Sequence, residues 1–428
     1  MPGTSRRRLS ARSGLVVALA AATALAAGCS TKAEDGGGGG DNGDAAAVKT
    51  GPGIEGTTIK LGVLTDTTGF FAATGKDLTL GQQHYWEKRN AEGGICDTYT
   101  VELVVENHGY NAQNAVTQYS AIKDEVLAFN QILGSPMAAA LSEDLEADDQ
   151  IAIPLSWNHG LTENPNYVLI GPTYDLELVN GLDFLLEKGI IQKGVKIGHI
   201  FHESEYGADA SAGVHAWAEA NGSEVVDQKI GAIDPADALV PRVTALKAAN
   251  VGLVVFTGTP DQTAAIAQAT ADQGLNVPIL GSGPTYGPPL LQTPAKDVLL
   301  ERFYYVGPHA GLDADVAKPV MELYKEKQGE GVPANSYVTG YISGLVMTEI
   351  LEKACADGDL TRAGVVAAKK SLTSIDTGGF TGPLDYSKLG ESPTRKNFVA
   401  KPAEGADGGS TAVGPNYEGP TAATYVRR

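Results

Sequence analysis

The sequence predicts an α/β protein with two lobes, because short apolar segments alternate with amphipathic ones over most of its length. The apolar runs GLVVF and VKIGHIF are continuous, which is typical of strands buried inside a parallel sheet. A chain of 428 residues is also too long for one ordinary hydrophobic core. The alternation indicates βαβ units, and we therefore expect two Rossmann-like lobes.

The first unit lies at residues 59–95. An apolar strand at 59–64 runs into a Thr/Gly loop, and an amphipathic helix follows that ends at Gly93-Gly94. In such a unit, the loop after the strand and the start of the helix face a ligand crevice. We therefore expect ligand contacts directly after residue 64.

Further elements follow in the same alternation. Strands are predicted at 100–105, 126–133, 151–155, 167–170, 195–201, 224–230, 251–256, 277–280 and 303–306, and helices at 112–123, 207–220, 238–249 and 263–273 among others.

The N-terminus is predicted to be an export signal, residues 1–28. Four arginines precede a stretch of small apolar residues at 15–27, which is too short to span a bilayer comfortably. The stretch ends in Leu25-Ala26-Ala27-Gly28-Cys29, which resembles a lipobox, so we expect cleavage before Cys29 and a lipid anchor on its sulfur. The alternative is an ordinary secretory signal with a chance cysteine.

The two ends of the mature chain have compositions that do not build a core. Residues 29–56 contain five consecutive glycines and are predicted to be a flexible tether. Residues 401–428 are rich in Gly, Ala and Pro and are predicted to be a flexible tail.

The net charge excludes some partners. It is −19 for the whole chain, and removal of a signal with four arginines and no acidic residue changes it to −23. Nucleic acid requires a basic face, so nucleic acid is not an expected partner. We expect membrane attachment through lipid chains only, on a protein that is otherwise in water.

Motifs for cofactors, metals and catalysis are absent or have the wrong spacing. GFFAATGK at 69–76 has five residues between its glycines where a phosphate loop has four. GSGPTYG at 281–287 is not a dinucleotide fingerprint, and His199 and His202 lack further metal ligands. There is no GxSxG nucleophile motif. We therefore expect no cofactor, no metal and no enzymatic activity.

Six segments together resemble one family. They are 59–95, 134–156, 202–226, 246–281, 336–351 and 380–386. Within the first segment, the residues that match the family's pattern include Thr68-Gly69, Asn90-Ala91 and Gly93-Gly94-Ile95. This order resembles branched-chain-amino-acid-type, leucine-binding-protein-like periplasmic solute-binding proteins of ABC importers. The resemblance implies a type I fold, a location outside the cytoplasm, ABC permease subunits as partners, and binding in place of bond-making.

The topology of that family implies three crossings between the lobes, which form a hinge. Lobe 1 is expected at 57–172 and 308–378, and lobe 2 at 173–307 and 379–400. Closure over a ligand is the expected motion.

The resemblance also implies where a ligand would bind. The loop after the first strand would contribute an aromatic or polar side chain. A second loop would contribute backbone N–H groups and a hydroxyl. A third loop would contribute the groups that hold the ligand's polar end. The residues at these positions, with those of lobe 2, are Phe71, Thr74, Ser135, Pro136, Met137, Ala138, Ser156, Trp157, Asn158, His159, Tyr206, Thr259, Ser282 and Tyr286.

One departure from the family concerns the ligand's charge. Amino-acid binders often carry an acidic residue in the loop at 281–289, and this chain has none there. A buried ammonium needs a carboxylate, so a plain Leu, Ile or Val ligand is disfavoured. Trp157, Tyr206, Tyr286 and Phe71 could instead enclose a ring or a larger apolar acid. The alternative is that Trp157 packs under its lobe and the ligand touches only polar groups.

Two cysteines remain after Cys29. Exported proteins meet an oxidising compartment, and the implied topology places Cys96 and Cys355 in the same lobe, so one disulfide is expected. Two buried free thiols are the alternative.

Two other functions stay open at this point. A ligand-sensing module of a signalling system can share this fold, and an exported hydrolase can use a similar two-lobed scaffold. The sequence does not identify the ligand.

Overall fold

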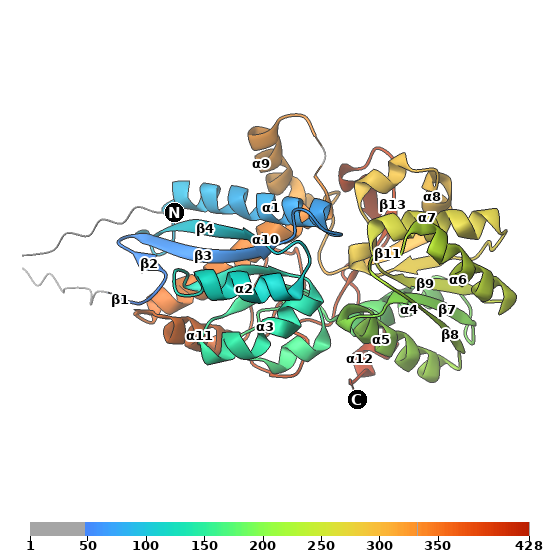
Figure 1. The fold of residues 1–428 in the computed structure, drawn as a ribbon, viewed down its shortest axis with the longest axis horizontal. Coiled ribbons are helices and arrows are strands. Elements are labelled where there is room, and N and C mark those ends of the chain that lie inside the picture. The colour runs from blue at the N-terminus through green and yellow to red at the C-terminus, as the bar shows by residue number, and fades with distance from the viewer. Residues whose placement is uncertain (1–47, 332, 428) are drawn as a thin grey trace, which may run out of the picture. The chain divides into compact units, whose positions relative to one another are not determined.

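The computed structural model describes residues 48–331 and 333–427, and these form two α/β lobes (Figure 1). The predicted fold class is confirmed. The predicted signal, Cys29 and residues 29–47 of the predicted tether lie outside the described residues. None of the helices in the described part is long and apolar enough to cross a membrane.

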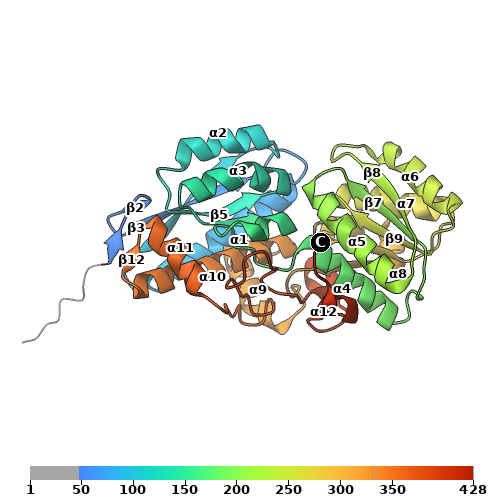
Figure 2. The ribbon, with the colours of Figure 1, turned by 90° about the horizontal axis from the view of Figure 1, so that it is seen from below.

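Lobe 1 contains a five-stranded sheet. Its central strand β3 (Thr58–Thr65) is parallel to β4 (Thr100–Asn107) and β5 (Ala128–Leu133), β5 is parallel to β6 (Ala152–Leu155), and β2 (Ile54–Glu55) pairs antiparallel with β3. The helices α1 (Ala72–Ala91), α10 (Asn335–Ala356) and α11 (Arg362–Ser371) pack on one face, and α2 (Ala112–Ile122) and α3 (Ser135–Ala147) pack on the other (Figure 2).

Lobe 2 contains a seven-stranded sheet in the order β14-β13-β11-β10-β9-β7-β8. The strands β7 (Ile197–His202), β8 (Val225–Ile230), β9 (Leu253–Thr257), β10 (Ile279–Gly281) and β11 (Phe303–Gly307) are parallel, and β13 (Phe398–Pro402) and β14 (Ser410–Ala412) are antiparallel. One face carries α4 (Tyr174–Glu187), α5 (Glu205–Asn221) and α12 (Pro420–Thr424), and the other carries α6 (Ala236–Ala248), α7 (Pro260–Asp272) and α8 (Lys296–Arg302).

The chain passes between the two sheets three times. It leaves lobe 1 after β6, returns after β11 through α9 (Lys318–Gln328) to α10, and enters the second sheet again at β13. This agrees with a three-segment hinge, while the residues at which each lobe was expected to begin and end stay predictions.

Eight of the nine strands predicted after the first overlap an observed strand, and one does not. The run at 167–170 is buried but forms only a single bridge, Tyr167 with Ala152. It is apolar because it fills the core beside β6, and apolar burial alone does not make a strand.

The ends of the described chain differ from the expected tether and tail. Within 48–56, β1 (Lys49–Thr50) pairs with β12 (Asp359–Leu360), and β2 pairs with β3. After residue 400, β13 and β14 extend the second sheet, and the start of α12 is held by α4. Asn180 accepts a hydrogen bond from the Gly419 N–H at 2.9 Å, and Asp183 accepts one from the Thr421 N–H at 2.7 Å. These partners are far away in sequence, so composition could not reveal them.

The predicted disulfide between Cys96 and Cys355 is present. It joins the segment after α1 to the end of α10, with 6.5 Å between the two Cα atoms.

Candidate ligand-binding site

A cavity of about 320 Å³ lies between the two lobes, at the carboxyl ends of their parallel strands. The loops after β3, β5 and β6 contribute Phe71, Ser135 and Trp157 to its wall. The loops after β9 and β10 contribute Thr259 and Tyr286 from the other lobe. Ligands of α/β folds bind at this edge of the sheet, so the cavity has the position expected of a binding site.

A buried carboxylate shapes the first loop. Asp66 accepts hydrogen bonds from the backbone N–H groups of Gly69 at 2.6 Å and Phe71 at 2.9 Å. Gly75 packs so closely on this loop that a Cβ atom there would lie 2.0 Å from the Asp66 carbonyl oxygen. The Thr-Gly loop and the glycine in the first turn of α1 therefore hold Phe71 against the cavity.

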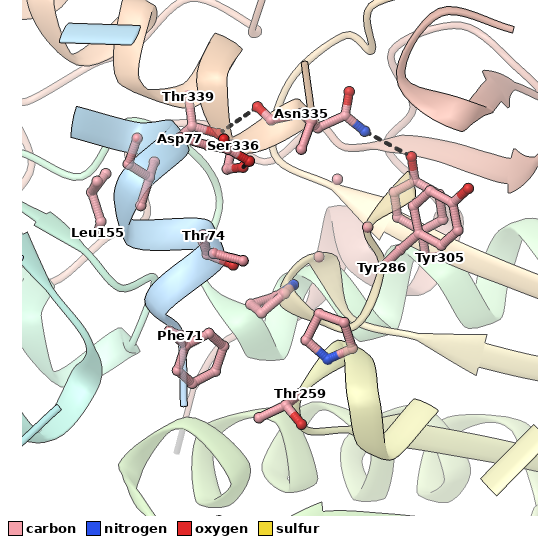
Figure 3. A pocket seen from close by; sticks show the side chains of 18 of the residues that line it. Phe71, Thr74, Asp77, Leu155, Thr259, Tyr286, Tyr305, Asn335, Ser336 and Thr339 are labelled. Atoms are coloured by element: carbon pink, nitrogen blue, oxygen red, sulfur yellow. Dashed lines mark hydrogen bonds between the residues drawn. The ribbon is translucent and has the colours of Figure 1, made fainter. Parts of the chain in front are cut away.

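Aromatic pairs form much of the wall. The ring centroids of Phe71 and Tyr110 are 4.8 Å apart, and those of Tyr174 and Tyr206 are 4.6 Å apart. Trp157 meets Tyr174 edge-on at 5.9 Å. On the opposite side, Tyr286 and Tyr305 stack at 4.7 Å (Figure 3). Rings from both lobes therefore surround the space, which suits an apolar ligand body.

One end of the cavity is polar. The Ser336 hydroxyl donates to Asp77 at 3.2 Å, and the Asn335 amide donates to the Tyr305 hydroxyl at 2.9 Å (Figure 3). The first bond ties α10 to α1, and the second ties α10 to β11 of the other lobe. Both bonds lie in the cavity wall where α10 begins.

His309 lies in the crossing after β11 and also lines the cavity. Its ring nitrogens hydrogen-bond to the Ala310 carbonyl at 2.8 Å and to the Thr339 hydroxyl at 2.7 Å. Burial of the ring lowers the pKa of His309 to about 4.

This burial predicts a loss of stability in mild acid. The unfolded chain binds a proton at His309 near pH 6.5, whereas the folded protein binds it only near pH 4. The free energy of unfolding should therefore be highest above pH 6.5 and should fall as the pH falls towards about 4. Burial also lowers the pKa of His108 to about 4 and that of His199 to about 3, so they add to the same trend.

Urea denaturation at several pH values between 7 and 4 measures this dependence. The His309→Gln variant should lose less stability over that range than the unmodified protein, because one of the three histidines is gone. Equal losses in the two proteins would contradict the assignment to His309.

The structure brings half of the predicted site residues to the cavity. They are Phe71, Thr74, Ser135, Trp157, Tyr206, Thr259 and Tyr286. Their roles in binding remain predictions, but a single wall now connects residues from loops on both lobes.

The other seven predicted residues do not line the cavity, for reasons of packing. Met137 and Ala138 lie in α3 and are fully buried, and the neighbouring Pro136 is half-buried. The remaining four make hydrogen bonds behind the wall: Ser156 to the Ser135 hydroxyl, Ser282 to the Tyr206 hydroxyl, Asn158 to the Glu205 carbonyl, and the His159 N–H to Asp209. They support the lining residues.

Several lining residues were missed. Tyr110 follows β4, and the rule that loops after parallel strands face the crevice would have identified it. Tyr305, Asn335 and Asp77 lie within a strand or in helices, and their positions depend on how the lobes pack. No local pattern indicated them.

Glu177 bears on the prediction that the loop at 281–289 has no carboxylate for a ligand's ammonium group. It projects from α4, lines the cavity and is only 3% exposed. Its Oε1 accepts a hydrogen bond from the Gly283 N–H at 2.9 Å, within the loop that lacks an acidic residue of its own. A carboxyl group therefore stands at this loop, supplied from 106 residues earlier, and the sequence argument against an ammonium no longer holds.

Comparisons with known proteins agree with this geometry. Residues 58–407 match the model of a family described as "Periplasmic binding protein". No curated protein matches the chain.

Solved structures of similar fold include a fatty acid ABC transporter substrate-binding protein from Thermomonospora curvata, with 38% identity and a TM-score of 0.85 over 88% of this chain and 97% of that one. A branched-chain amino acid ABC transporter protein from Thermus thermophilus, with bound valine, has 18% identity and a TM-score of 0.75 over 86% and 98%. A leucine-binding protein from Thermotoga maritima has 19% identity and a TM-score of 0.69 over 83% and 98%. At such identities the last two show the shared fold alone.

Proposed function

The chain belongs to the type I periplasmic binding protein family, and from this premise we propose that it captures a small molecule with a large apolar body and delivers it to an ABC permease. Members of this family bind solutes outside the cytoplasm. The observation that carries the proposal is the cavity between the lobes, whose wall combines aromatic side chains of both.

Closure follows from this two-sided wall. A ligand held by Phe71 and Trp157 in lobe 1 and by Tyr286 in lobe 2 makes more contacts when the lobes are together. Such a ligand binds the closed form more tightly and shifts the population towards it. The permease would then recognise the closed form.

The ligand class is an extended apolar molecule. The Thermomonospora curvata protein, which is 38% identical, is named for fatty acids, and that name supports a long apolar body here but no particular head group. An aliphatic or aromatic body would fill the aromatic cavity here, with about 0.8 kcal/mol gained for each methylene group removed from water. An anchor on Cys29 would keep the protein at the membrane beside its permease.

A thermal-shift screen tests this function. Alkyl compounds of increasing chain length, aromatic acids and the standard amino acids are each added to the purified protein. A ligand that binds only the folded state raises the melting temperature. Shifts that grow with apolar size would support the proposal, whereas a response only to small polar compounds would contradict it.

A substitution tests the aromatic wall. Trp157→Ala should weaken binding of an apolar ligand by at least about tenfold, because it removes a half-buried indole from the cavity. Titration calorimetry gives the dissociation constant. The control is Tyr304→Ala, which removes a half-buried ring that does not line the cavity. Equal affinities of both variants and the unmodified protein would remove Trp157 from the site.

A further inference from the structure

We propose that Glu177 is the counter-charge for a positively charged nitrogen of the ligand, so that the protein selects an apolar molecule with a protonated amine. This inference rests on the proposed function for the apolar body and adds the head group. The amine could belong to an amino acid with a large apolar side chain or to a simple alkyl amine.

The first support is the position of Glu177. It lies in the first turn of α4, in the cavity wall, and is 97% buried. Its Oε1 accepts one hydrogen bond, from the Gly283 N–H, and its Oε2 has no partner among the described residues. A buried carboxyl group with an unused oxygen is costly unless something else completes it.

The second support is the balance of charge around the cavity. Its wall holds the carboxyl groups of Asp77, Glu177 and Asp261, and no Lys or Arg is among the described residues that line it. An anionic ligand would be enclosed without an opposite charge, which buried ions do not tolerate. A cationic ligand would find carboxylates on both lobes, since Asp77 comes from α1 and Glu177 from α4.

The surroundings of Glu177 indicate how its charge would change. Asp209 and Tyr206 face it from α5, Tyr174 faces it from its own helix, and Gly283 contacts it from the loop after β10. Asp209 in turn pairs with Arg427 at 3.3 Å. Burial, and then the negative charge of Asp209, raise the pKa of Glu177 well above its usual range.

Binding of an ammonium ligand should therefore release a proton. Because its pKa is raised, Glu177 carries a proton over a wider pH range before binding than an exposed glutamate does. When the ammonium arrives, the carboxyl group loses its proton to the buffer and the resulting carboxylate pairs with the ligand. The α4 N-terminus adds a favourable field for that negative charge.

The experiment compares three eight-carbon ligands that differ in head group. They are octylamine, 2-aminooctanoate and octanoate, titrated into the purified protein by calorimetry in buffers of different ionisation enthalpy. The amine and the amino acid separate the two sources of the ammonium, and the buffer series counts the protons released. The variants are Glu177→Gln and, as a matched control, Glu187→Gln at the exposed end of the same helix.

The expected result is that at least one ammonium ligand binds more tightly than octanoate, with a net release of protons to the buffer. Glu177→Gln should weaken that ligand by about a hundredfold and abolish the release, as truncation of a buried charge pair does. The control should behave like the unmodified protein.

Two results would overturn the inference. If octanoate binds tightest, or if Glu177→Gln leaves ammonium binding unchanged, the head group is not held by Glu177, although an apolar ligand still binds and the proposed function stands. If none of the three ligands binds, the proposed function fails, and the inference fails with it.

Discussion

Replacement of Gly340 by alanine is expected to lower the free energy of unfolding by about 3 kcal/mol. Gly340 lies where α10 crosses α1, and a Cβ atom there would lie 2.0 Å from the Leu78 carbonyl oxygen. The contact is reciprocal, since a Cβ atom at Gly81 of α1 would lie 2.1 Å from the Tyr337 carbonyl oxygen. Both neighbours are backbone atoms of helices and cannot turn away, so the helices must separate.

Urea denaturation followed by circular dichroism measures this loss. Gly51→Ala is the control, because a Cβ atom there would make only an ordinary contact with Thr361 at 3.4 Å, and its expected cost is below about 1 kcal/mol. The same crossing positions Asp77 and Ser336 at the cavity, so ligand affinity should fall as well. A Gly340→Ala protein as stable as the control would refute the close packing of the two helices.

Loss of the disulfide should have an effect of similar size. The bond between Cys96 and Cys355 closes a segment of 259 residues and joins the segment after α1 to the end of α10. Removal of such a bond costs about 2–5 kcal/mol, because the unfolded chain gains freedom. The double variant Cys96→Ser/Cys355→Ser should therefore unfold at lower urea concentration.

A second set of contacts at the same junction should preserve the local structure when the disulfide is absent. Glu352 accepts a hydrogen bond from the Cys96 N–H at 3.0 Å and also pairs with Arg89. The folded double variant should consequently keep its ligand affinity while it loses stability. Non-reducing peptide mapping checks the bond itself, and two thiols that can be alkylated in the native protein would show that it does not form.

Much of the fold could be predicted because strands and helices reflect patterns within a few neighbouring residues. The runs at 251–256 and 303–306 are continuously apolar, and both became buried parallel strands. The run at 167–170 has the same composition yet forms a single bridge. Apolar composition reports burial, and whether a buried segment pairs depends on which backbone lies beside it.

The site was predictable to the extent that it follows strand ends. Phe71, Ser135 and Trp157 were expected from the loops after their strands, and all three line the cavity. Met137 and Ala138 belong to one such loop and helix but turn into the core. Which residue of a loop faces the ligand depends on the helix that follows it.

The sequence by itself determined the α/β class, the alternation of elements and the family, because hydrophobic periodicity and short motifs are local properties. Only the tertiary structure decided the charge of the cavity and the order of the C-terminal segment. Glu177 reaches the loop at Gly283 across 106 residues, and α4 holds α12 through Asn180 and Asp183. Such contacts form when distant elements pack together, and no local pattern of residues encodes them.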